Sequence, residues 1–260
     1  MLERITPLIL TFNEAPNIDR VLSRLRWARR IVVVDSGSND GTLEIIAEHA
    51  NAEVISRKFD KHAAQWNFGL DTVGSDTEWV LAIDADYVLS DELVRELGTL
   101  NPGDDVVGYR AHFLYCIQGK AIRSGTYPPV IVLYRRNHAR YLQDGHTQRL
   151  AVEGRIEDLV GKIHHDDRKP LARWLESQRI YAQLEVAHLH KVDRHALKWQ
   201  DRIRLMVGVA PPCMFLYVYL FRGGFLDGTH GLLYALQRAY AELLLSLALL
   251  DRRLRRPTGE

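Results

Sequence analysis

Two carboxylates that follow an apolar segment are the residues best suited to chemistry in this chain. Asp84 and Asp86 lie one residue apart, directly after the run Trp79 to Ile83. Hard divalent cations such as Mg²⁺ and Mn²⁺ prefer oxygen ligands, and proteins hold them with one or two carboxylates together with substrate phosphates. The pattern therefore indicates a cation site beside a phosphate group. Loops are polar, however, so an acidic pair after a strand is also consistent with an ordinary loop.

A second polar segment, Asp35 to Thr42, follows the apolar run Ile31 to Val34 and contains two glycines. Glycine permits unusual backbone angles and a close approach of a ligand. An acid at the end of a strand, as Asp35 is expected to be, can accept hydrogen bonds from a nucleoside base or a ribose. Asp40 and Thr42 are expected to fix the turn or to cap the helix that follows.

The elements around these segments alternate between strand-like and helix-like patterns, which predicts an α/β fold with a mostly parallel central sheet. Because ligands of open α/β sheets bind outside the carboxyl ends of the strands, Asp35 and Asp84 are expected to share one edge. Ser90 is a predicted helix N-cap, and residues 106–150 predict a mixed or antiparallel edge. The expected strands are 5–12, 31–34, 52–56 and 79–83, and the expected helices 18–25, 43–49, 61–73 and 91–100.

Three motifs, in this order and spacing, resemble the family 2 glycosyltransferases of the GT-A fold. They are Thr11–Glu14, Val34–Thr42 and Asp84–Asp86, and the likeness extends through Gln65–Gly69 to about residue 165. The resemblance is strongest to the bacterial branch that includes lipopolysaccharide-core glucosyltransferases. It implies a nucleotide-sugar-binding catalytic domain over residues 1–165. Residues 166–260 are expected to form a helical region that associates with a membrane or forms oligomers.

The resemblance also implies roles for individual residues of the donor site. Asp86 is expected to be the principal metal ligand, and Asp84 to contact the ion or the ribose. By likeness to GT-A enzymes that complete the metal sphere with a late histidine, His165 or His164 is expected to approach the ion; helix capping and local ion pairs are the alternative for that cluster. The expected donor-binding residues are Phe12, Asn13, Glu14, Asp35, Arg57, Asn67, Asp84 and Ala85.

The acceptor side departs from the family's pattern. A typical inverting member uses an acidic residue to take the proton of the acceptor hydroxyl, but Gln148 stands where a glutamate is often found. A glutamine cannot act as a general base. Asp144 and His146 are therefore the candidates, the latter because the ordinary pKa of histidine lies near neutrality. A role in stabilising the loop is the alternative for both.

The end of the chain contains two apolar stretches. Residues 205–221 are interrupted by Pro211 and Pro212, and residues 231–250 include Arg238 and Glu242, so neither is predicted to be a simple membrane span. The arginines that follow, Arg252, Arg253, Arg255 and Arg256, can meet anionic lipid headgroups. Peripheral association with the inner membrane is favoured over a homo-oligomer in which these segments bury one another.

Composition limits the remaining choices. The chain has 260 residues and a formal net charge of only +1, so we expect no nucleic-acid partner. Its two cysteines lack disulfide or zinc-site spacing, and no secretory signal is recognised, so a cytoplasmic location, at the face of the membrane, is expected.

These features together predict an inverting enzyme that uses Mn²⁺ or Mg²⁺ to transfer a sugar from a UDP-linked nucleoside diphosphate sugar. The expected acceptor is a cell-envelope glycan or its lipid-linked precursor. One alternative is a sugar-phosphate nucleotidyltransferase, although no glycine-rich basic loop follows Phe12. The other is a noncatalytic nucleotide-sugar-binding protein at the membrane, if Gln148 marks lost activity.

Overall fold

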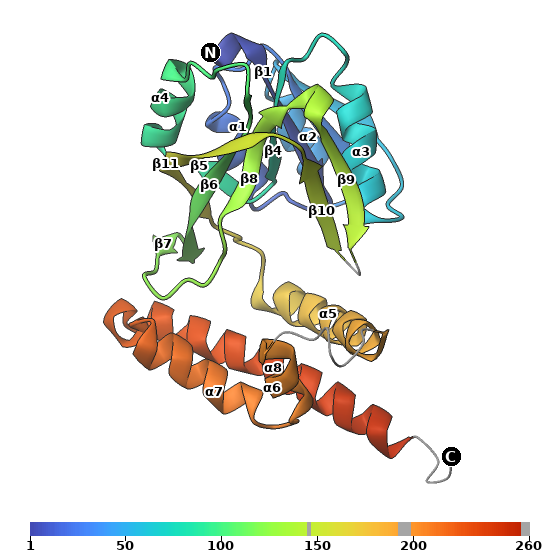
Figure 1. Cartoon of the computed structure of the whole chain (residues 1–260), viewed down its shortest axis with the longest axis vertical. Helices are drawn as coiled ribbons and strands as arrows, with labels where there is room; N and C mark the ends of the chain where they lie inside the picture. Colours follow the sequence, from blue (N-terminus) through green and yellow to red (C-terminus); the bar gives the residue numbers. More distant parts are fainter. Residues whose placement is uncertain (145–146, 192–198, 256–260) are drawn as a thin grey trace. The chain divides into compact units, whose positions relative to one another are not determined.

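The computed structural model describes residues 1–144, 147–191 and 199–255 (Figure 1). These residues form two compact units. The first comprises Met1–Gly119 and Tyr127–Arg168, and the second comprises Lys120–Thr126 and Lys169–Glu260. A short segment from the middle of the chain therefore folds with the C-terminal region.

The first unit alternates strands and helices and then continues mainly as strands. Its elements in chain order are η1 (Leu2–Arg4), β1 (Ile5–Thr11), α1 (Ile18–Ser23), β2 (Ile31–Asp35), α2 (Thr42–Ala47), β3 (Ala52–Ser56), α3 (His62–Thr72), β4 (Trp79–Asp84), β5 (Tyr87–Leu89), α4 (Asp91–Thr99), β6 (Val106–Ile117), β8 (Val130–Arg135), η2 (Arg136–His138), β9 (Ala139–Asp144), β10 (Thr147–Val152) and β11 (Arg155–His165).

The central sheet has the strand order β3-β2-β1-β4-β8-β6-β11-β5. The four strands from β3 to β4 are parallel, as the alternating sequence pattern predicts. Strand β8 pairs antiparallel with both β4 and β6, and β11 runs parallel to β6 and antiparallel to β5. The mixed edge expected for residues 106–150 is therefore confirmed, while β9 and β10 form a separate antiparallel hairpin.

Helices cover both faces of this sheet. Strand β2 is apolar throughout because Ile31 and Val33 pack on one face, with α1 and α4, whereas Val32 and Val34 pack on the other, with α3. The register pairs Thr11 with Asp35 and Leu10 with Asp84. The two acids thus flank the end of β1, which confirms the predicted shared edge.

Helix α4 fixes an irregularity in β11. The side chain of Ser90 accepts a hydrogen bond from Leu93 N, which confirms the predicted N-cap. The pairing of β11 with β6 shifts between Asp158 and Lys162. The N–H groups of Val160 and Gly161 in this bulge donate to the carboxylate of Glu96 at 2.8–3.1 Å, so α4 satisfies backbone groups that the strand ladder leaves unpaired.

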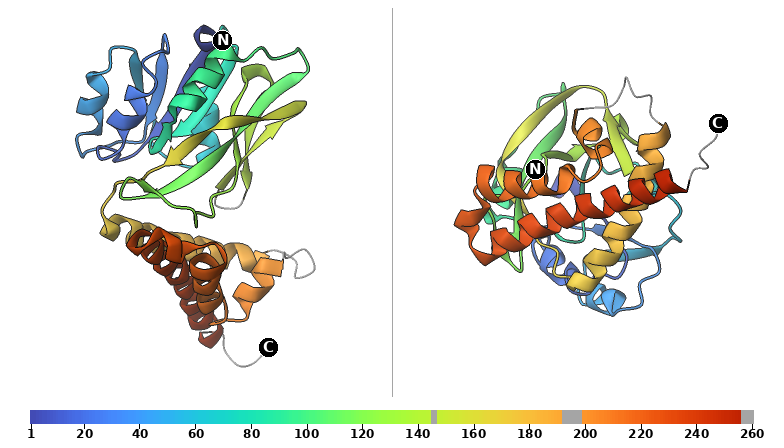
Figure 2. Two further views of the ribbon diagram at one scale, coloured as in Figure 1. Left: turned by 90° about the vertical axis from the view of Figure 1, so that its left-hand side faces the viewer. Right: turned by 90° about the horizontal axis from the view of Figure 1, so that it is seen from below.

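The second unit is helical apart from the short strand β7 (Lys120–Ala121). Its helices are α5 (Leu171–Lys191), α6 (Trp199–Leu205), α7 (Ala210–Leu216), η3 (Tyr217–Phe221), η4 (Gly224–Asp227) and α8 (Thr229–Leu254). Helices α7 and α8, drawn in orange and red, lie side by side (Figure 2). Pro211 and Pro212 occupy the first turn of α7, where missing N–H groups cost nothing, so they start a helix instead of interrupting one.

Residues 120–126 are tied to the helices of this unit by a buried carboxylate. Asp227 accepts hydrogen bonds from the N–H groups of Arg123 and Ser124 at 3.0–3.1 Å and from the hydroxyl of Ser124 at 2.8 Å. The hydroxyl groups of Thr126 and Tyr234 lie 2.7 Å apart. These contacts explain why this segment belongs to the helical unit.

Helix α8 is long and apolar enough to cross a membrane, and it is the one such helix in the described part of the chain. A third of its most apolar window, 33%, is buried within the protein. Its buried Glu242 pairs with Arg204 of α6 at 2.9 Å. The pKa of Arg204 is raised, since burial, which lowers it, is outweighed by the hydrogen bond to Glu242 and by the neighbouring carboxylates. Glu242, the acid within the apolar stretch 231–250, therefore forms an ion pair inside the helical unit.

Candidate active site

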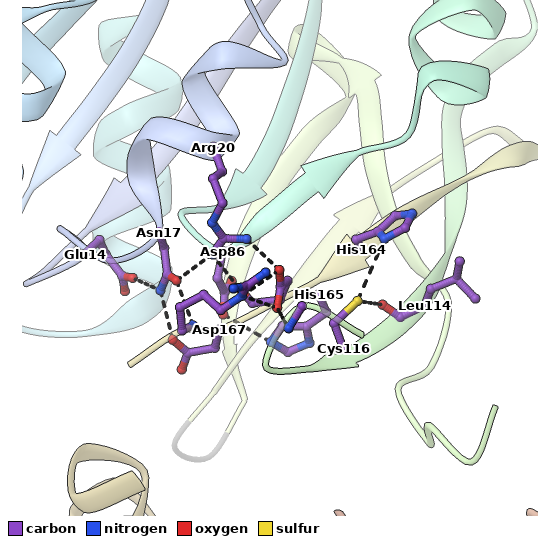
Figure 3. Close-up of polar contacts among 12 residues, drawn as sticks. Glu14, Asn17, Arg20, Asp86, Leu114, Cys116, His164, His165 and Asp167 are labelled. Carbon is purple, nitrogen blue, oxygen red and sulfur yellow. Dashed lines mark hydrogen bonds and ion pairs between the residues drawn. The ribbon is translucent and has the colours of Figure 1, made fainter. Parts of the chain in front are cut away.

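The end of β11 brings a histidine to the second carboxylate of the predicted metal motif. The antiparallel pairing of β11 with β5 sets His165 opposite Tyr87, next to Asp86 in the chain. The Nε2 atom of His165 lies 3.2 Å from Oδ2 of Asp86 (Figure 3). Both side chains are largely buried, with exposed fractions of 16% and 15%. Two residues that the sequence assigns to one site are thus in contact.

The surrounding charges favour the protonated form of His165. Burial alone would lower its pKa, but the hydrogen bond to Asp86 and the negative charges of Asp86 and Asp84 outweigh burial and raise the pKa. In the described part of the chain, the Nδ1 atom is buried without a hydrogen-bond partner. The ring is therefore held mainly by Asp86 and by packing.

Three tyrosines pack edge-on against His165, and no pattern in the sequence signals them. The ring of His165 lies 5.1 Å from Tyr87, 4.9 Å from Tyr115 and 4.6 Å from Tyr127, measured between ring centroids. The hydroxyl groups of Tyr87 and Tyr127 are hydrogen-bonded to each other. Burial and the charge of Asp84 raise the pKa of Tyr87 far above its usual range, so this phenol stays protonated.

His164 is placed differently. Neighbouring side chains of a strand point to opposite faces, and Nδ1 of His164 lies 3.8 Å from the Sγ atom of Cys116 (Figure 3). Burial raises the pKa of the Cys116 thiol to about 11, so the sulfur is a neutral neighbour. Of the two histidines proposed as metal ligands, the structure brings only His165 to Asp86.

The carboxylate motif itself divides into exposed and buried positions. Asp84 is exposed, whereas Ala85 as a whole residue is only 2% exposed, so little of Ala85 is accessible to a sugar donor. No group of three or more His, Cys, Asp or Glu side chains is arranged to hold a metal ion within residues 1–144, 147–191 and 199–255. A cation at Asp86 and His165 would take its remaining ligands from substrate phosphate or water.

Asp35 holds the turn that follows β2. Its carboxylate, 1% exposed, accepts hydrogen bonds from four donors. Oδ1 accepts from the hydroxyls of Thr11 and Ser38 at 3.0 and 2.5 Å. Oδ2 accepts from the N–H groups of Gly37 and Ser38 at 2.8 and 2.9 Å. Both oxygens are thus already used within the protein, and a nucleoside would share them.

The same turn fixes the loop after β1 that contains the other predicted nucleotide contacts. The N–H of Asn13 donates to the hydroxyl of Ser38, and the N–H of Glu14 donates to that of Thr42, both at 2.8 Å. Asn13 adopts a left-handed backbone with φ of 56°. Phe12 is 47% exposed beside it. The first two motifs are therefore one structural unit.

Arg57 and Asn67, the remaining predicted donor residues, make contacts within the protein. The guanidinium of Arg57 binds both oxygens of Asp60 at 2.9 and 3.0 Å. The amide of Asn67 donates to the carbonyl of Tyr141 at 2.8 Å and accepts from its N–H at 2.9 Å. Asn67 thus attaches α3 to the β9–β10 hairpin.

The predicted acceptor-side residues lie on that hairpin. Gln148 of β10 pairs with Gln143 of β9, and the backbone of Asp144, at the end of β9, pairs with Thr147. The side chain of Asp144 is outside what the structure describes, and His146 lies outside the described residues altogether. The choice of general base stays a prediction.

The first unit also contains a buried polar network that the sequence did not reveal. Asn17, Arg20 and Asp166 link the loop after β1 to the segment after β11. The network joins residues about 150 positions apart, so no local spacing signals it.

Comparisons with known proteins define the class of this chain. The sequence matches the model of glycosyl transferase family 2 over residues 8–138, and the chain belongs to that family. This family assignment agrees with the resemblance of the three sequence motifs, and the expected GT-A fold is confirmed. Family membership also argues against a nucleotidyltransferase.

Several relatives are similar over different lengths. An uncharacterized glycosyltransferase from Rickettsia bellii is 38% identical over 36% of this chain and 32% of its own length. The chain thus spans about a third of the length of that relative, and 33% of the length of another from Rickettsia felis. The lipopolysaccharide core biosynthesis glycosyltransferase LpsC from Rhizobium meliloti is 25% identical over 89% of this chain and 88% of its own. Staphylococcus aureus TarS with UDP-GlcNAc aligns over 98% of this chain and 93% of that structure, with 14% identity and a TM-score of 0.46.

Proposed function

We propose that the chain transfers a sugar from a UDP-linked donor to a hydroxyl of a cell-envelope glycan or its lipid-linked precursor, with inversion at the anomeric carbon. The contact of Asp86 with His165 at the carboxyl edge of the sheet is the observation that supports this most directly. The similarity to LpsC along most of both chains supports an acceptor in the lipopolysaccharide core.

The donor atoms at this edge fit a divalent cation. Carboxylate oxygen and imidazole nitrogen are both ligands for Mn²⁺, and the two atoms lie 3.2 Å apart, close enough to share one ion. Asp86 and His165 would hold the cation, and Asp84 would contact the ion or the ribose of the donor. The bound ion would neutralise charge on the departing diphosphate.

The chain's own residues would then bind and orient the donor. The loop at Phe12 to Glu14, fixed by the turn that Asp35 holds, offers an exposed aromatic ring to the base of the nucleotide. The tyrosines around His165 limit water at the ion side of the site. An acidic group near the tip of the β9–β10 hairpin, Asp144 in our assignment, would take the proton of the acceptor hydroxyl.

The helical unit supports a location at the cytoplasmic face of the membrane. Its exposed apolar side chains include Phe221, which is 82% exposed, and Leu226, which is 61% exposed. One side of α8 presents an apolar stripe at alternating spacings of three and four residues, opposite its buried residues. The stripe consists of Leu233, Leu236, Tyr240, Leu243, Leu247, Leu250 and Leu254.

The test is donor turnover with a panel of nucleotide sugars and Mn²⁺. We expect a UDP-sugar to be hydrolysed or transferred by the purified protein, and the Asp86→Ala variant to lose this turnover together with Mn²⁺ binding. Asp104→Ala, which removes an exposed carboxylate before β6, is the matched control and should behave as wild type. Unchanged Mn²⁺ binding and turnover in Asp86→Ala would contradict the metal assignment.

A further inference from the structure

Asn17 is a fully buried asparagine whose amide makes four hydrogen bonds (Figure 3). Its Nδ2 donates to the carboxylates of Glu14 and Asp167, both at 2.9 Å. Its Oδ1 accepts from Nη2 of Arg20 at 2.9 Å and from the N–H of Arg168 at 2.8 Å. Carboxylates can only accept, and guanidinium and peptide N–H groups can only donate, so the amide has one satisfactory orientation.

Asp166 is the second centre of this network. Its carboxylate, in a residue that is 6% exposed, accepts from Nη1 of Arg20 at 2.7 Å, from Nε of Arg168 at 2.8 Å and from the N–H of Gly119 at 3.1 Å. Arg20 also donates from Nη2 to the carbonyl of Asp166 at 2.8 Å. One guanidinium therefore joins Asp166 to Asn17.

The same segment is attached to the metal motif. The N–H of Asp166 donates to the carbonyl of Asp86 at 3.0 Å, directly after the pairing of His165 with Tyr87. His165 is thus held in place by contacts on two sides. The turn containing Asp86 holds it on one side, and Asn17 and Arg20 hold residues 166–168 on the other.

We infer that Asn17 and Arg20 are positioning residues that hold His165 against Asp86 and keep Glu14 of the donor loop in register with them. This inference rests on the proposed function for its catalytic consequence. Charge explains why an amide is required. An aspartate at position 17 would lose both donors and would set a third carboxylate within hydrogen-bond distance of Glu14 and Asp167.

The decisive variant is Asn17→Asp, which keeps the shape of the side chain but replaces the donating Nδ2 with an oxygen that can only accept. Loss of residues that orient metal ligands typically costs 10–100-fold in activity or metal affinity, and we expect kcat/KM for the donor to fall by about this factor. We also expect the Mn²⁺ concentration for half-maximal rate to rise. The double variant Asn17→Asp with Asp167→Asn returns an amide donor opposite the carboxylate introduced at position 17 and should recover part of the loss.

A matched control separates positioning from general stability. Nδ2 of Asn51 also donates two hydrogen bonds, to the carbonyls of Leu25 and Ala28 at 3.3 and 2.8 Å, away from the site. Asn51→Asp should therefore lower the melting temperature without changing the Mn²⁺ dependence. If Asn17→Asp folds poorly, Arg20→Lys serves instead, since a lysine keeps the charge beside Asp166 but cannot bridge to Asn17.

The outcomes distinguish this inference from the proposed function. If the wild-type protein turns over no nucleotide sugar, the proposed function fails, and crystal structures of the wild type and the Asn17→Asp variant still decide the inference. It predicts that residues 165–168 move and that the distance from Nε2 of His165 to Oδ2 of Asp86 increases. An unchanged distance, or Mn²⁺ dependence equal to that of the Asn51→Asp control, would overturn it.

Discussion

The Nε2 atom of His165 lies 3.2 Å from the Oδ2 atom of Asp86, and the two residues come from the end of β11 and from the turn after β4. Burial opposes a charge on the imidazole, but the carboxylates of Asp86 and Asp84 overcome this and raise its pKa. The contact is therefore strongest when the histidine is protonated, which competes with metal binding.

This competition predicts opposite pH dependences for stability and for Mn²⁺ binding. A raised pKa in the folded state stabilises the metal-free protein fully below the unfolded pKa of about 6.5, and this contribution is lost as the pH rises through the folded pKa. Mn²⁺ affinity should increase through the same window because the imidazole must lose its proton. Unfolding by urea and titration calorimetry with Mn²⁺, from pH 5.5 upward, measure both.

The His165→Gln variant should lose both dependences in that window. His138→Gln, which changes an exposed histidine in η2, is the control and should retain them. If His165→Gln kept the wild-type rise of Mn²⁺ affinity with pH, the imidazole would not be a ligand.

Asp35 allows a test of whether its main role is in the turn or in the donor site. Asp35→Ala leaves the N–H groups of Gly37 and Ser38 unpaired, and we expect a loss of about 3 kcal/mol in the free energy of unfolding. In Asp35→Asn, the amide oxygen can still accept from these N–H groups while the hydroxyls of Thr11 and Ser38 rotate to accept from Nδ2. The expected loss is then about 1 kcal/mol.

Donor affinity distinguishes the two roles. A tenfold or greater loss of UDP binding in Asp35→Asn, measured by calorimetry, would mean that a nucleoside shares the carboxylate. The control is Asp71→Ala, which changes an exposed acid of α3. If Asp35→Asn binds UDP as tightly as this control, Asp35 acts only in the turn.

Local patterns predicted the parallel half of the fold well. Strand β3 has the predicted bounds, and β2 and β4 extend one residue beyond the prediction to include Asp35 and Asp84. Hydrophobic runs and turn residues suffice here because each strand and helix is signalled by its own local pattern. The shared edge of the two acids follows from parallel topology alone.

Features that depend on distant pairing were not predictable in the same way. The motif predicts Asn67 as a donor residue, but it gives no sign that the amide also pairs with the backbone of Tyr141. Residues 120–126 join the helical unit through Asp227, which has no local sequence signal. Each of these contacts joins residues more than 70 positions apart, so only the folded topology reveals them.

Gly161 provides a stability test of the packing between β11 and α4. A Cβ atom at this position would lie 2.4 Å from the Cα atom of Leu93, and a helix backbone cannot yield as a flexible side chain can. We expect Gly161→Ala to cost about 3 kcal/mol or more in the free energy of unfolding, measured by urea denaturation.

Gly98, on the same helix, is the matched control. A Cβ atom there would meet only the side chain of Leu2 at an ordinary 3.7 Å. Alanine favours helix by up to about 1 kcal/mol over glycine, so Gly98→Ala should be neutral or stabilising. Similar stabilities for the two variants would contradict the described packing of α4 against the bulge.

The exposed apolar side chains of the helical unit predict binding to lipid vesicles. Phe221, Phe225 and Leu226 are 82%, 51% and 61% exposed, and Arg252, Arg253 and Arg255 follow in the last turns of α8 and just after it. Each buried apolar side chain contributes roughly 1.5–3 kcal/mol, and each arginine near anionic headgroups about 1 kcal/mol. We expect stronger sedimentation with phosphatidylglycerol vesicles than with phosphatidylcholine vesicles.

Two sets of substitutions separate these contributions. The triple change of Phe221, Phe225 and Leu226 to serine should weaken binding to both kinds of vesicle by about a thousandfold if all three side chains are buried in the lipid. Changing the three arginines to glutamine should weaken binding only to anionic vesicles. The effect of this change should become smaller as salt is added, because salt screens the charges. Val160→Ser, which removes an 85% exposed apolar side chain from the other unit, should change neither. If the serine variant instead converts a dimer to a monomer in sedimentation equilibrium and leaves vesicle binding unchanged, the apolar side chains bind a second copy of the chain and not a membrane.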